Sequence, residues 1–184
     1  MTRRDALKTL LISTGWSPTW AAKPSVTTLI GTGAAGYSEQ QVNNPYGLVT
    51  GPDRALYFCD LDNQRIRRLD LRTRRISTVA GNGQKAYTGD GERATAASLN
   101  MPHEIQFDAE GHLYIAERDN HVIRKYIPRE NKLVRIAGTA KAGRTLNDDP
   151  LKTELNQPHG VAVDGQGRIY IADSSNGRVL RLNP

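Results

Sequence analysis

An internal repeat constrains this chain more than any other feature of its sequence. A similar proline-containing segment occurs three times, at residues 44–50, 100–108 and 157–164, with its prolines 57 and then 56 residues apart. Self-similarity at such a period is typical of proteins built from copies of one supersecondary unit, which stack on their neighbours to bury a shared core. The sequence therefore predicts a repeat protein with three copies of the unit.

Each copy consists of short runs rich in β-branched, aromatic and aliphatic residues. The proline-containing run is followed by a second run at residues 56–60, 113–117 and 169–173, and by a third run at residues 65–69, 122–126 and 178–182. A fourth run is present at residues 76–81 and 133–138. Four strand-like runs per copy, separated by turn residues, predict a four-stranded antiparallel sheet of the kind that forms a propeller blade.

Turn residues mark the same places in each copy. The second run ends in an acidic residue, and an asparagine follows three residues later; we expect both to hydrogen-bond nearby backbone. These pairs are Asp60 and Asn63, Glu117 and Asn120, and Asp173 and Asn176. Gly111 and Gly167 predict a hairpin turn between the first two runs. Because Arg54 replaces that glycine in the first copy, the turn there is predicted at residues 51–53 instead.

These motifs resemble the NHL repeat family, in the long-period form common in bacterial propellers. The resemblance extends over about residues 25–184 and rests on motifs such as Thr-Val-Ala-Gly-Asn-Gly (78–83), Asn-His-Val-Ile-Arg-Lys (120–125) and Tyr-Ile-Ala-Asp (170–173). It implies an all-β fold of NHL-type β-propeller blades, with repeats at about residues 44–81, 100–138 and 157–182. Because propellers of this family have about six blades, the three blades make half of a six-bladed propeller.

The third copy is incomplete, and one strand is unmatched. No fourth run follows the third run of the last copy, whereas residues 26–31 have the pattern of a fourth run in front of the first copy. We expect residues 26–31 to complete the last blade, in cis or in trans. In trans, two chains arranged head to tail form a homodimer that closes a six-bladed ring. An open half-propeller and a shortened gene product are the alternatives, since loss of whole blades leaves the same phase.

Residues 1–22 resemble a twin-arginine signal peptide. Residues 2–8, Thr-Arg-Arg-Asp-Ala-Leu-Lys, follow that pattern except at Ala6, and a short apolar stretch and the small residues Ala21 and Ala22 come later. Cleavage after Ala21 suits signal peptidase better, since cleavage after Ala22 places Trp20 in a small-residue subsite. The sequence predicts export to the periplasm or the extracellular space, with the propeller segment at residues 23–184; a disordered basic tail is the alternative.

Charge and composition exclude several other classes of protein. The formal net charge of +6 falls to +4 when residues 1–22 are set aside, and the remaining charges are mixed along the chain, so a nucleic-acid partner is not expected. No apolar run is long enough to cross a membrane as a helix. The single cysteine, Cys59, can form no internal disulfide, and we expect it to be a small buried apolar residue.

The residue after each repeat's proline is the strongest candidate for function. The innermost strand of a propeller blade begins near the central axis, so Tyr46, His103 and His159 are expected to line the mouth of the channel. Histidines from neighbouring blades suit a divalent transition metal such as zinc, which makes His103 and His159 candidate ligands. Glu104 is the one acid at the start of an inner strand and is a further axis-lining candidate.

Two metal-dependent propeller enzymes offer partial resemblances. The Pro-His segments at His103 and His159 are similar to zinc-binding segments of the peptidyl-hydroxyglycine amidating lyase, but that family takes three histidines from alternate blades, and its catalytic tyrosine and arginine have no evident counterpart. Gluconolactonase-like propellers bind calcium through several oxygen ligands, for which Glu104 alone is not enough. The sequence has no nucleophile elbow, phosphate loop or paired-cysteine metal motif.

These observations favour an exported binding or assembly module that acts without catalysis. Propeller loops form a rigid platform, and no complete catalytic set is visible. The expected partner is a protein or a small molecule on a propeller face, and no cofactor is required. The alternative is a metal-dependent lyase or hydrolase, of the amidating-lyase or lactonase kind, that uses the axis-lining histidines.

Overall fold

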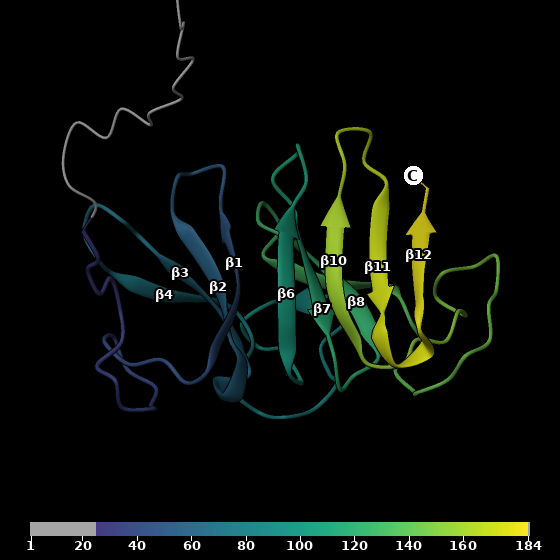
Figure 1. Cartoon of the computed structure of the whole chain (residues 1–184), viewed down its shortest axis with the longest axis horizontal. Coiled ribbons are helices and arrows are strands. Elements are labelled where there is room, and N and C mark those ends of the chain that lie inside the picture. The colour runs from purple at the N-terminus through teal and green to yellow at the C-terminus, as the bar shows by residue number, and fades with distance from the viewer. Residues whose placement is uncertain (1–24, 184) are drawn as a thin grey trace, which may run out of the picture.

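The computed structural model describes residues 25–183, and the predicted signal peptide lies outside them. The described part of the chain is all-β, as the sequence predicts, and its strands form three sheets placed side by side (Figure 1). The strands are β1 (Pro45–Thr50), β2 (Leu56–Asp60), β3 (Arg65–Leu69), β4 (Ile76–Ala80), β5 (Glu92–Arg93), β6 (Pro102–Phe107), β7 (Leu113–Glu117), β8 (Val122–Ile127), β9 (Lys132–Ala137), β10 (Pro158–Val163), β11 (Ile169–Asp173) and β12 (Arg178–Leu182). Two 3-10 helices, η1 (Leu61–Asn63) and η2 (Ser174–Asn176), connect second strands to third strands.

Each sheet is one antiparallel blade that runs from an inner to an outer strand. Blade 1 has the order β1-β2-β3-β4, blade 2 has the order β6-β7-β8-β9 with the short β5 beyond β9, and blade 3 has the order β10-β11-β12. The predicted runs of the three copies agree with the observed strands to within two residues at each end, which confirms the blade architecture. No helix in the described residues is long and apolar enough to span a membrane.

The turn between β1 and β2 contains the predicted residues 51–53, but Arg54 closes it in the position that glycine holds in the other two blades. The amide of Arg54 donates a hydrogen bond of 2.9 Å to the carbonyl of Gly51, as Gly111 does to Asp108 at 3.2 Å in blade 2. Arg54 has a φ of +63°, in the left-handed region where Gly111 has a φ of +84°. The turn therefore has the same position as in blade 2. Because the two paired strands fix its geometry, Arg54 adopts a backbone conformation that favours glycine.

The prediction of a strand at residues 26–31 is wrong for the single chain. These described residues form no strand, and Val26 is fully exposed. A strand needs a neighbouring edge to satisfy its backbone groups. The segment leads into blade 1, whereas blade 3 lies at the opposite end of the row of blades (Figure 1). Completion of the last blade in cis is not observed, and completion in trans stays a prediction.

The hydrophobic core lies between the blades. One cluster joins blades 1 and 2 and includes Cys59, which is buried as predicted and whose thiol pKa is raised by that burial. A second cluster joins blades 2 and 3. Because side chains alternate between the two faces of a strand, a blade buries both faces only between two neighbours. Blade 2 meets this condition, whereas blades 1 and 3 have a blade on one side only within the described part of the chain.

A buried acid at the end of the second strand ties each blade to the segment that precedes it. In blade 2 the Glu117 carboxylate accepts hydrogen bonds from the side chain of Asn120 and from the amide of Asn100. Asp60 and Asp173 accept equivalent bonds in blades 1 and 3. The predicted backbone-binding role of these acids is therefore confirmed, and they hold the fold together rather than a ligand.

Candidate functional site

Three rings form a row along the inner strands of the blades. Tyr46, His103 and His159 follow the prolines that begin β1, β6 and β10, and each lies at a β-bulge in the pairing with the second strand. The ring centroids are 4.6 Å apart between Tyr46 and His103 and 4.4 Å apart between His103 and His159. The structure thus brings together the three residues that the sequence singles out, and we call them the axial row.

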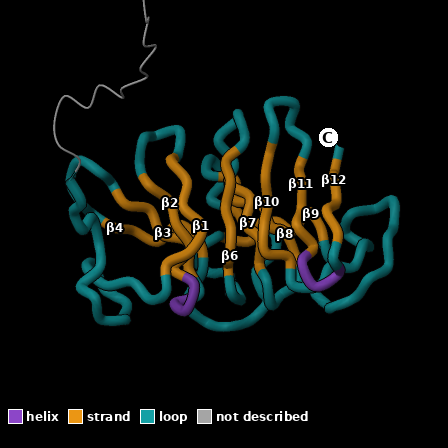
Figure 2. Tube along the Cα trace, in the orientation of Figure 1, coloured by secondary structure: helices purple, strands orange, loops and turns teal. Residues whose placement is uncertain are grey.

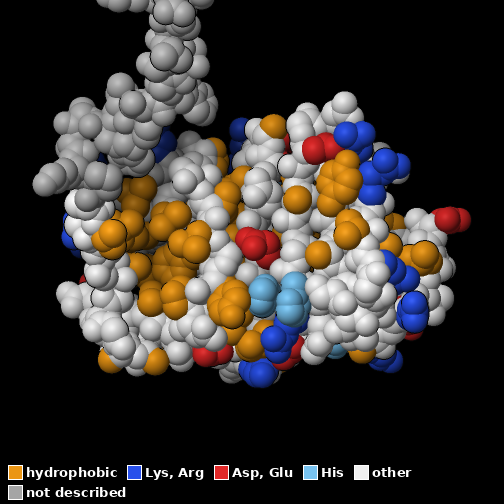
Figure 3. All heavy atoms as spheres, viewed as in Figure 1, with side chains coloured by type: hydrophobic (Ala, Val, Ile, Leu, Met, Phe, Trp, Pro, Cys, Tyr) orange, Lys and Arg blue, Asp and Glu red, His pale blue; other side chains and the backbone are white. Residues whose placement is uncertain are grey.

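The rings of the axial row contact one another through their faces. The two imidazoles are stacked with an angle of 21° between their planes, and the Tyr46 ring is tilted by 49° against His103. Two histidine side chains are visible next to each other on the face viewed in Figure 3. Tyr46 ends the row and is 41% exposed, so the stack has a free aromatic surface at this end.

The environment of His103 favours a neutral imidazole. Partial burial lowers the pKa of His103, and the charge of a protonated His159 lowers it further. The Arg118 guanidinium adds a smaller effect in the same direction. His103 Nδ1 lies 3.2 Å from the carbonyl oxygen of His159, so a proton on Nδ1 is donated to that oxygen and Nε2 is left as an acceptor.

Glu104 lies beside the axial row and is held by its own strand. Its Oε1 accepts a hydrogen bond of 3.1 Å from the amide of Ile105. Blades 1 and 2 approach closely here, because a Cβ atom on Gly47 would lie only 2.8 Å from the carbonyl oxygen of His103 and 2.9 Å from Glu104 Cα. Glycine at position 47 therefore allows Tyr46 to reach His103.

The axial row does not fit the predicted metal site in its present geometry. The lone pair of an imidazole nitrogen lies in the ring plane, so stacked and nearly parallel rings cannot direct both nitrogens at one ion. His103 Nδ1 also faces a carbonyl oxygen. Within residues 25–183, no third histidine, cysteine or carboxylate ligand joins His103 and His159. Zinc binding at this pair stays a prediction, and it needs the two rings to reorient.

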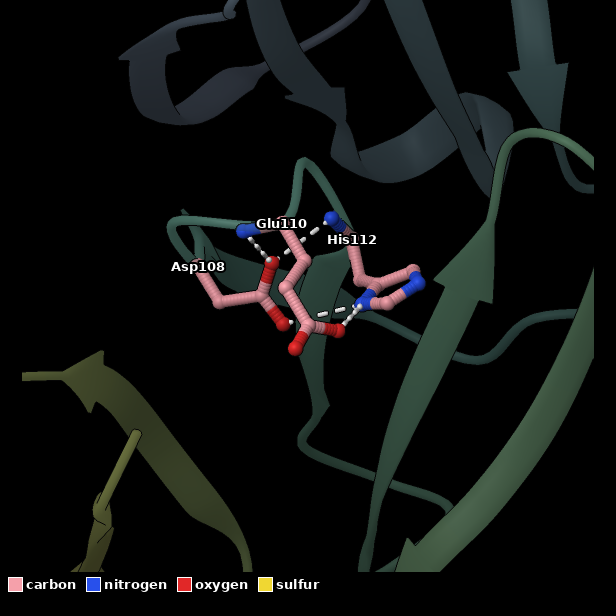
Figure 4. Close-up of side chains that lie close together, drawn as sticks. All are labelled: Asp108, Glu110 and His112. Carbon is pink, nitrogen blue, oxygen red and sulfur yellow. Dashed lines mark hydrogen bonds and ion pairs between the residues drawn. The ribbon is translucent and has the colours of Figure 1, made fainter. Parts of the chain in front are cut away.

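A polar cluster that is not among the sites predicted from the sequence lies at the turn between β6 and β7. The side chains of Asp108, Glu110 and His112 point toward one another in this turn (Figure 4), with one ligand atom from each within 4.8 Å of the others. His112 Nδ1 lies 3.0 Å from Asp108 Oδ2 and 3.4 Å from Glu110 Oε2. The alternation of acid, acid and histidine at every second residue was the available signal.

The same turn in blade 3 explains this cluster without a ligand. Asp164 Oδ1 accepts a backbone hydrogen bond from Arg168, and its Oδ2 accepts one from the Arg168 side chain, just as Asp108 binds the backbone and ring of His112. Burial acts to raise the pKa of Asp108, but the hydrogen bonds from His112 outweigh it and lower the pKa. The cluster is therefore a repeated turn motif in which Asp108 already has its partners.

Comparison with known proteins places these blades in a family context. Residues 155–182, which contain β10 to β12, match the family described as NHL repeat. The chain is 33% identical over 150 residues to Protein SUPPRESSOR OF QUENCHING 1, chloroplastic, of Arabidopsis thaliana, covering 76% of this chain and 14% of that protein. It is 27% identical over 169 residues to NHL repeat-containing protein 2 of Bos taurus, covering 80% of this chain and 23% of that protein.

The chain thus spans less than a quarter of the length of these curated relatives. A solved structure of similar fold is that of an auxiliary nutrient binding protein from Bacteroides thetaiotaomicron, with a TM-score of 0.64 and 21% identity. The match covers 79% of this chain and 38% of that chain. Sequence and structure agree that the chain is a β-propeller segment of NHL-type blades, and that its last blade is an NHL repeat.

Proposed function

We propose that this chain is a noncatalytic binding module and that its ligand lies on the axial row. The observation that carries the proposal is the contact among Tyr46, His103 and His159, which come from three different blades. The side chains of these residues are not needed for strand pairing, since the backbone of each inner strand makes its ladder without them. A row of partly exposed rings on a rigid sheet edge suits recognition, because the rings lose little conformational freedom when a ligand binds.

The chemistry of the row indicates the class of ligand. The free face of Tyr46 offers a surface on which a planar ring or peptide group can stack. The nearby Arg118 guanidinium provides hydrogen-bond donors and positive charge beside the row. We therefore propose a ligand that combines a flat group with an acceptor oxygen, such as an aromatic carboxylate or the equivalent side chain and backbone of a peptide.

Two further considerations bear on this proposal. The fold is similar to that of a protein described as nutrient binding, which is in keeping with a ligand-binding role. We propose export by the twin-arginine route from the pattern at residues 2–8, which places the ligand outside the cytoplasm. A metal-dependent lyase or hydrolase gains no support from the stacked geometry of His103 and His159.

Histidine ring signals in NMR spectra give a direct test, because the chain has only four histidines. Sodium 4-hydroxybenzoate serves as the probe and is added stepwise to the purified chain. We expect the ring signals of His103 and His159 to shift together and to saturate, while those of His112 and His121 stay in place. Substitution Tyr46→Ala removes the stacking surface and should weaken binding of the probe up to about 10-fold.

Tyr37→Ala is the matched control, since Tyr37 is also exposed but lies on the segment in front of blade 1. It should leave the affinity unchanged. Equal shifts of all four histidines, or no shift at any probe concentration, would refute binding of this class at the axial row. A separate titration with Zn²⁺ tests the alternative of a metal-dependent lyase or hydrolase. Saturable coordination of Zn²⁺ by His103 and His159 would support that alternative.

A further inference from the structure

The outer edge of blade 3 lacks the partner that the other two blades have. β3 pairs with β4 and β8 pairs with β9, whereas no strand within residues 25–183 pairs with the outer edge of β12. Val179 on β12 is 72% exposed, although its counterparts Ile66 and Ile123 are fully buried. An edge with free backbone groups and an exposed apolar side chain is a template for another strand.

A slot for such a strand lies beside β12. In blade 2, β9 runs between β8 and the short β5, which belongs to the segment connecting blades 1 and 2. In blade 3 the connecting segment at residues 146–153 curves past the outer side of β12 (Figure 2), and a cavity of about 310 Å³ separates the two. Leu146, Leu155 and Leu180 line this cavity. The cavity occupies the place that β9 fills in blade 2.

Residues 26–33 have the pattern and part of the conformation of a fourth strand. Residues 26–31 align with residues 76–81 and 133–138, each of which ends in glycine. Gly31 has a φ of +100° and Gly33 a φ of +82°, close to the +90° and +92° of Gly81 and Gly83 after β4. The backbone that follows a fourth strand is therefore already formed, while Val26 and Leu29 in front of it are exposed.

Residues 26–33 lead into blade 1, and contacts with blade 1 keep them away from the slot beside β12 of the same chain. The side-chain Nδ2 of Asn63 in blade 1 donates a hydrogen bond of 2.8 Å to the carbonyl of Gly36, and the Tyr37 ring lies 3.8 Å from the Arg65 guanidinium. Figure 1 shows blade 1 and β12 at opposite ends of the row of blades. In a second copy of the chain, the same segment can lie beside β12 of the first copy. We therefore take a second copy as the occupant of the slot.

Exposed apolar side chains gather at the two ends that such an association would bury. The blade 1 end, with the segment leading into it, has Val26, Leu29, Tyr37 and Leu48, and the blade 3 end has Leu146, Leu151 and Val179. Of the other large apolar side chains that are exposed in the described residues, Leu71 lies in the turn between β3 and β4 of blade 1, and Tyr46 belongs to the axial row. This distribution indicates that both end blades have an apolar face for a neighbouring blade.

We infer that residues 26–30 of one copy form the fourth strand of blade 3 in a second copy. The pairing of β3 with β4 sets the register, in which Ile66 lies opposite Ala80 and Leu69 opposite Ile76. By equivalence, Val179 lies opposite Ile30 and Leu182 opposite Val26. The same contact made in return closes a ring of six blades from two chains. The inference does not depend on the ligand proposed for the axial row.

Cross-linking of the predicted pair tests the inference. The substitutions Ile30→Cys and Val179→Cys place two thiols on directly opposed residues of neighbouring strands, within the range for a disulfide. The native Cys59 is fully buried and does not compete. We expect the double variant to form a covalent dimer under mild oxidation, and an equal mixture of the two single variants to form a covalent heterodimer. A disulfide within one chain, or no disulfide, overturns the inference.

The molar mass of the purified full chain, measured by light scattering over a range of concentrations, gives an independent readout. We expect twice the mass of one chain. Val179→Asp places a charge in the pairing edge and should raise the dimer dissociation constant at least about 100-fold. Arg129→Asp places the same charge in an exposed turn between β8 and β9 of the central blade 2 and should leave the dimer intact. A monomer at all concentrations, or a dimer insensitive to Val179→Asp, overturns the inference.

Discussion

Substitution of Arg124 tests whether a buried ion pair fastens the connecting segment to blade 2. The Arg124 side chain is fully buried; its Nη1 donates to the carbonyl of Ser98 at 3.1 Å and to Glu117 Oε1 at 3.3 Å, and its Nη2 donates to the carbonyl of Thr88 at 2.9 Å. Blade 3 carries Leu180 at the equivalent position. Leucine at position 124 is therefore compatible with the blade backbone. The substitution Arg124→Leu removes both the charge and the hydrogen bonds to the carbonyls of Ser98 and Thr88.

The expected loss of stability depends on the hydrogen bonds that Glu117 keeps when Arg124 is replaced. Without Arg124 its carboxyl group is still buried and retains only the bonds from Asn120 and Asn100. Removal of one partner from a buried pair costs about 3–5 kcal/mol, because the other charge stays behind without compensation. The double variant that adds Glu117→Gln should recover a substantial part of this loss, since the remaining group is then neutral.

The pH dependence gives a second and independent signature. Burial raises the pKa of Glu117 from its usual 4.5 to about 7, and the Arg124 charge keeps it from rising further. A carboxyl group with a raised pKa in the folded state contributes most stability at low pH and loses it as the pH rises. In the native chain this loss of stability ends near pH 7. In Arg124→Leu it continues at higher pH, because the pKa of Glu117 is higher without the Arg124 charge. The stability difference should therefore widen above pH 7, by up to about 1.4 kcal/mol per pH unit.

Urea unfolding followed by circular dichroism at pH 5, 7 and 8.5 measures these free energies. Arg168→Leu is the matched control, because Arg168 pairs with Asp164 at the surface, where solvent screens the two charges and the loss of the pair should cost little stability. The reasoning fails if Arg124→Leu costs no more than Arg168→Leu, or if its cost is the same at pH 5 and pH 8.5.

Three other predictions follow from backbone geometry and from the N-terminal motif. Arg54→Gly should stabilise the fold by about 0.5–1 kcal/mol in the same urea assay, because it relieves a positive φ in an exposed turn. Gly47→Ala should destabilise the chain by about 1–3 kcal/mol and shift the His103 ring signal, since its Cβ meets blade 2. Gly160→Ala is milder, because its Cβ lies 3.3 Å from Ala172 Cβ in its own blade. Replacing both arginines of residues 2–8 with lysine should retain a reporter fusion in the cytoplasm, as fractionation would show.

Local pattern was enough to predict the strands of the three blades, apart from the short β5. β2, β3, β7 and β11 begin and end where their runs of apolar and β-branched residues do, because period and turn residues are properties of adjacent positions. The same reasoning placed the backbone-binding role of Glu117 and its equivalents. Where it failed, a contact distant in sequence decided the outcome.

Two failures illustrate this. Arg54 has no intrinsic preference for a positive φ, and only the pairing of β1 with β2 imposes it. Residues 26–31 have a strand pattern, but the pattern does not contain the edge that a strand needs, and the single chain offers none at that end. Sequence pattern predicts which segments can pair, whereas the position of a partner depends on how whole blades are arranged.

The axial row shows the same limit for function. Its position could be read from the repeated proline, since the residue after it begins the inner strand in every blade. The relation between the rings could not, because it depends on the spacing between blades that Gly47 permits and on the hydrogen bond between His103 and the His159 backbone. Two histidines that resemble metal ligands in the sequence form a stacked pair in the structure. Their ring planes are nearly parallel, and Nδ1 of His103 faces the carbonyl oxygen of His159.

Comparison of equivalent positions across the three blades separates framework from function. The acid at the end of the second strand keeps the same bonds in all three blades, because each blade needs its preceding segment held. The position after the proline holds tyrosine once and histidine twice, and its side chain takes no part in the pairing of the inner strand with the second strand. If two copies close a ring, the two axial rows face a common axis, and a ligand bound there meets rings from both chains. Loss of probe binding in a monomeric Val179→Asp variant, with the axial row itself unchanged, would show that assembly creates the binding site.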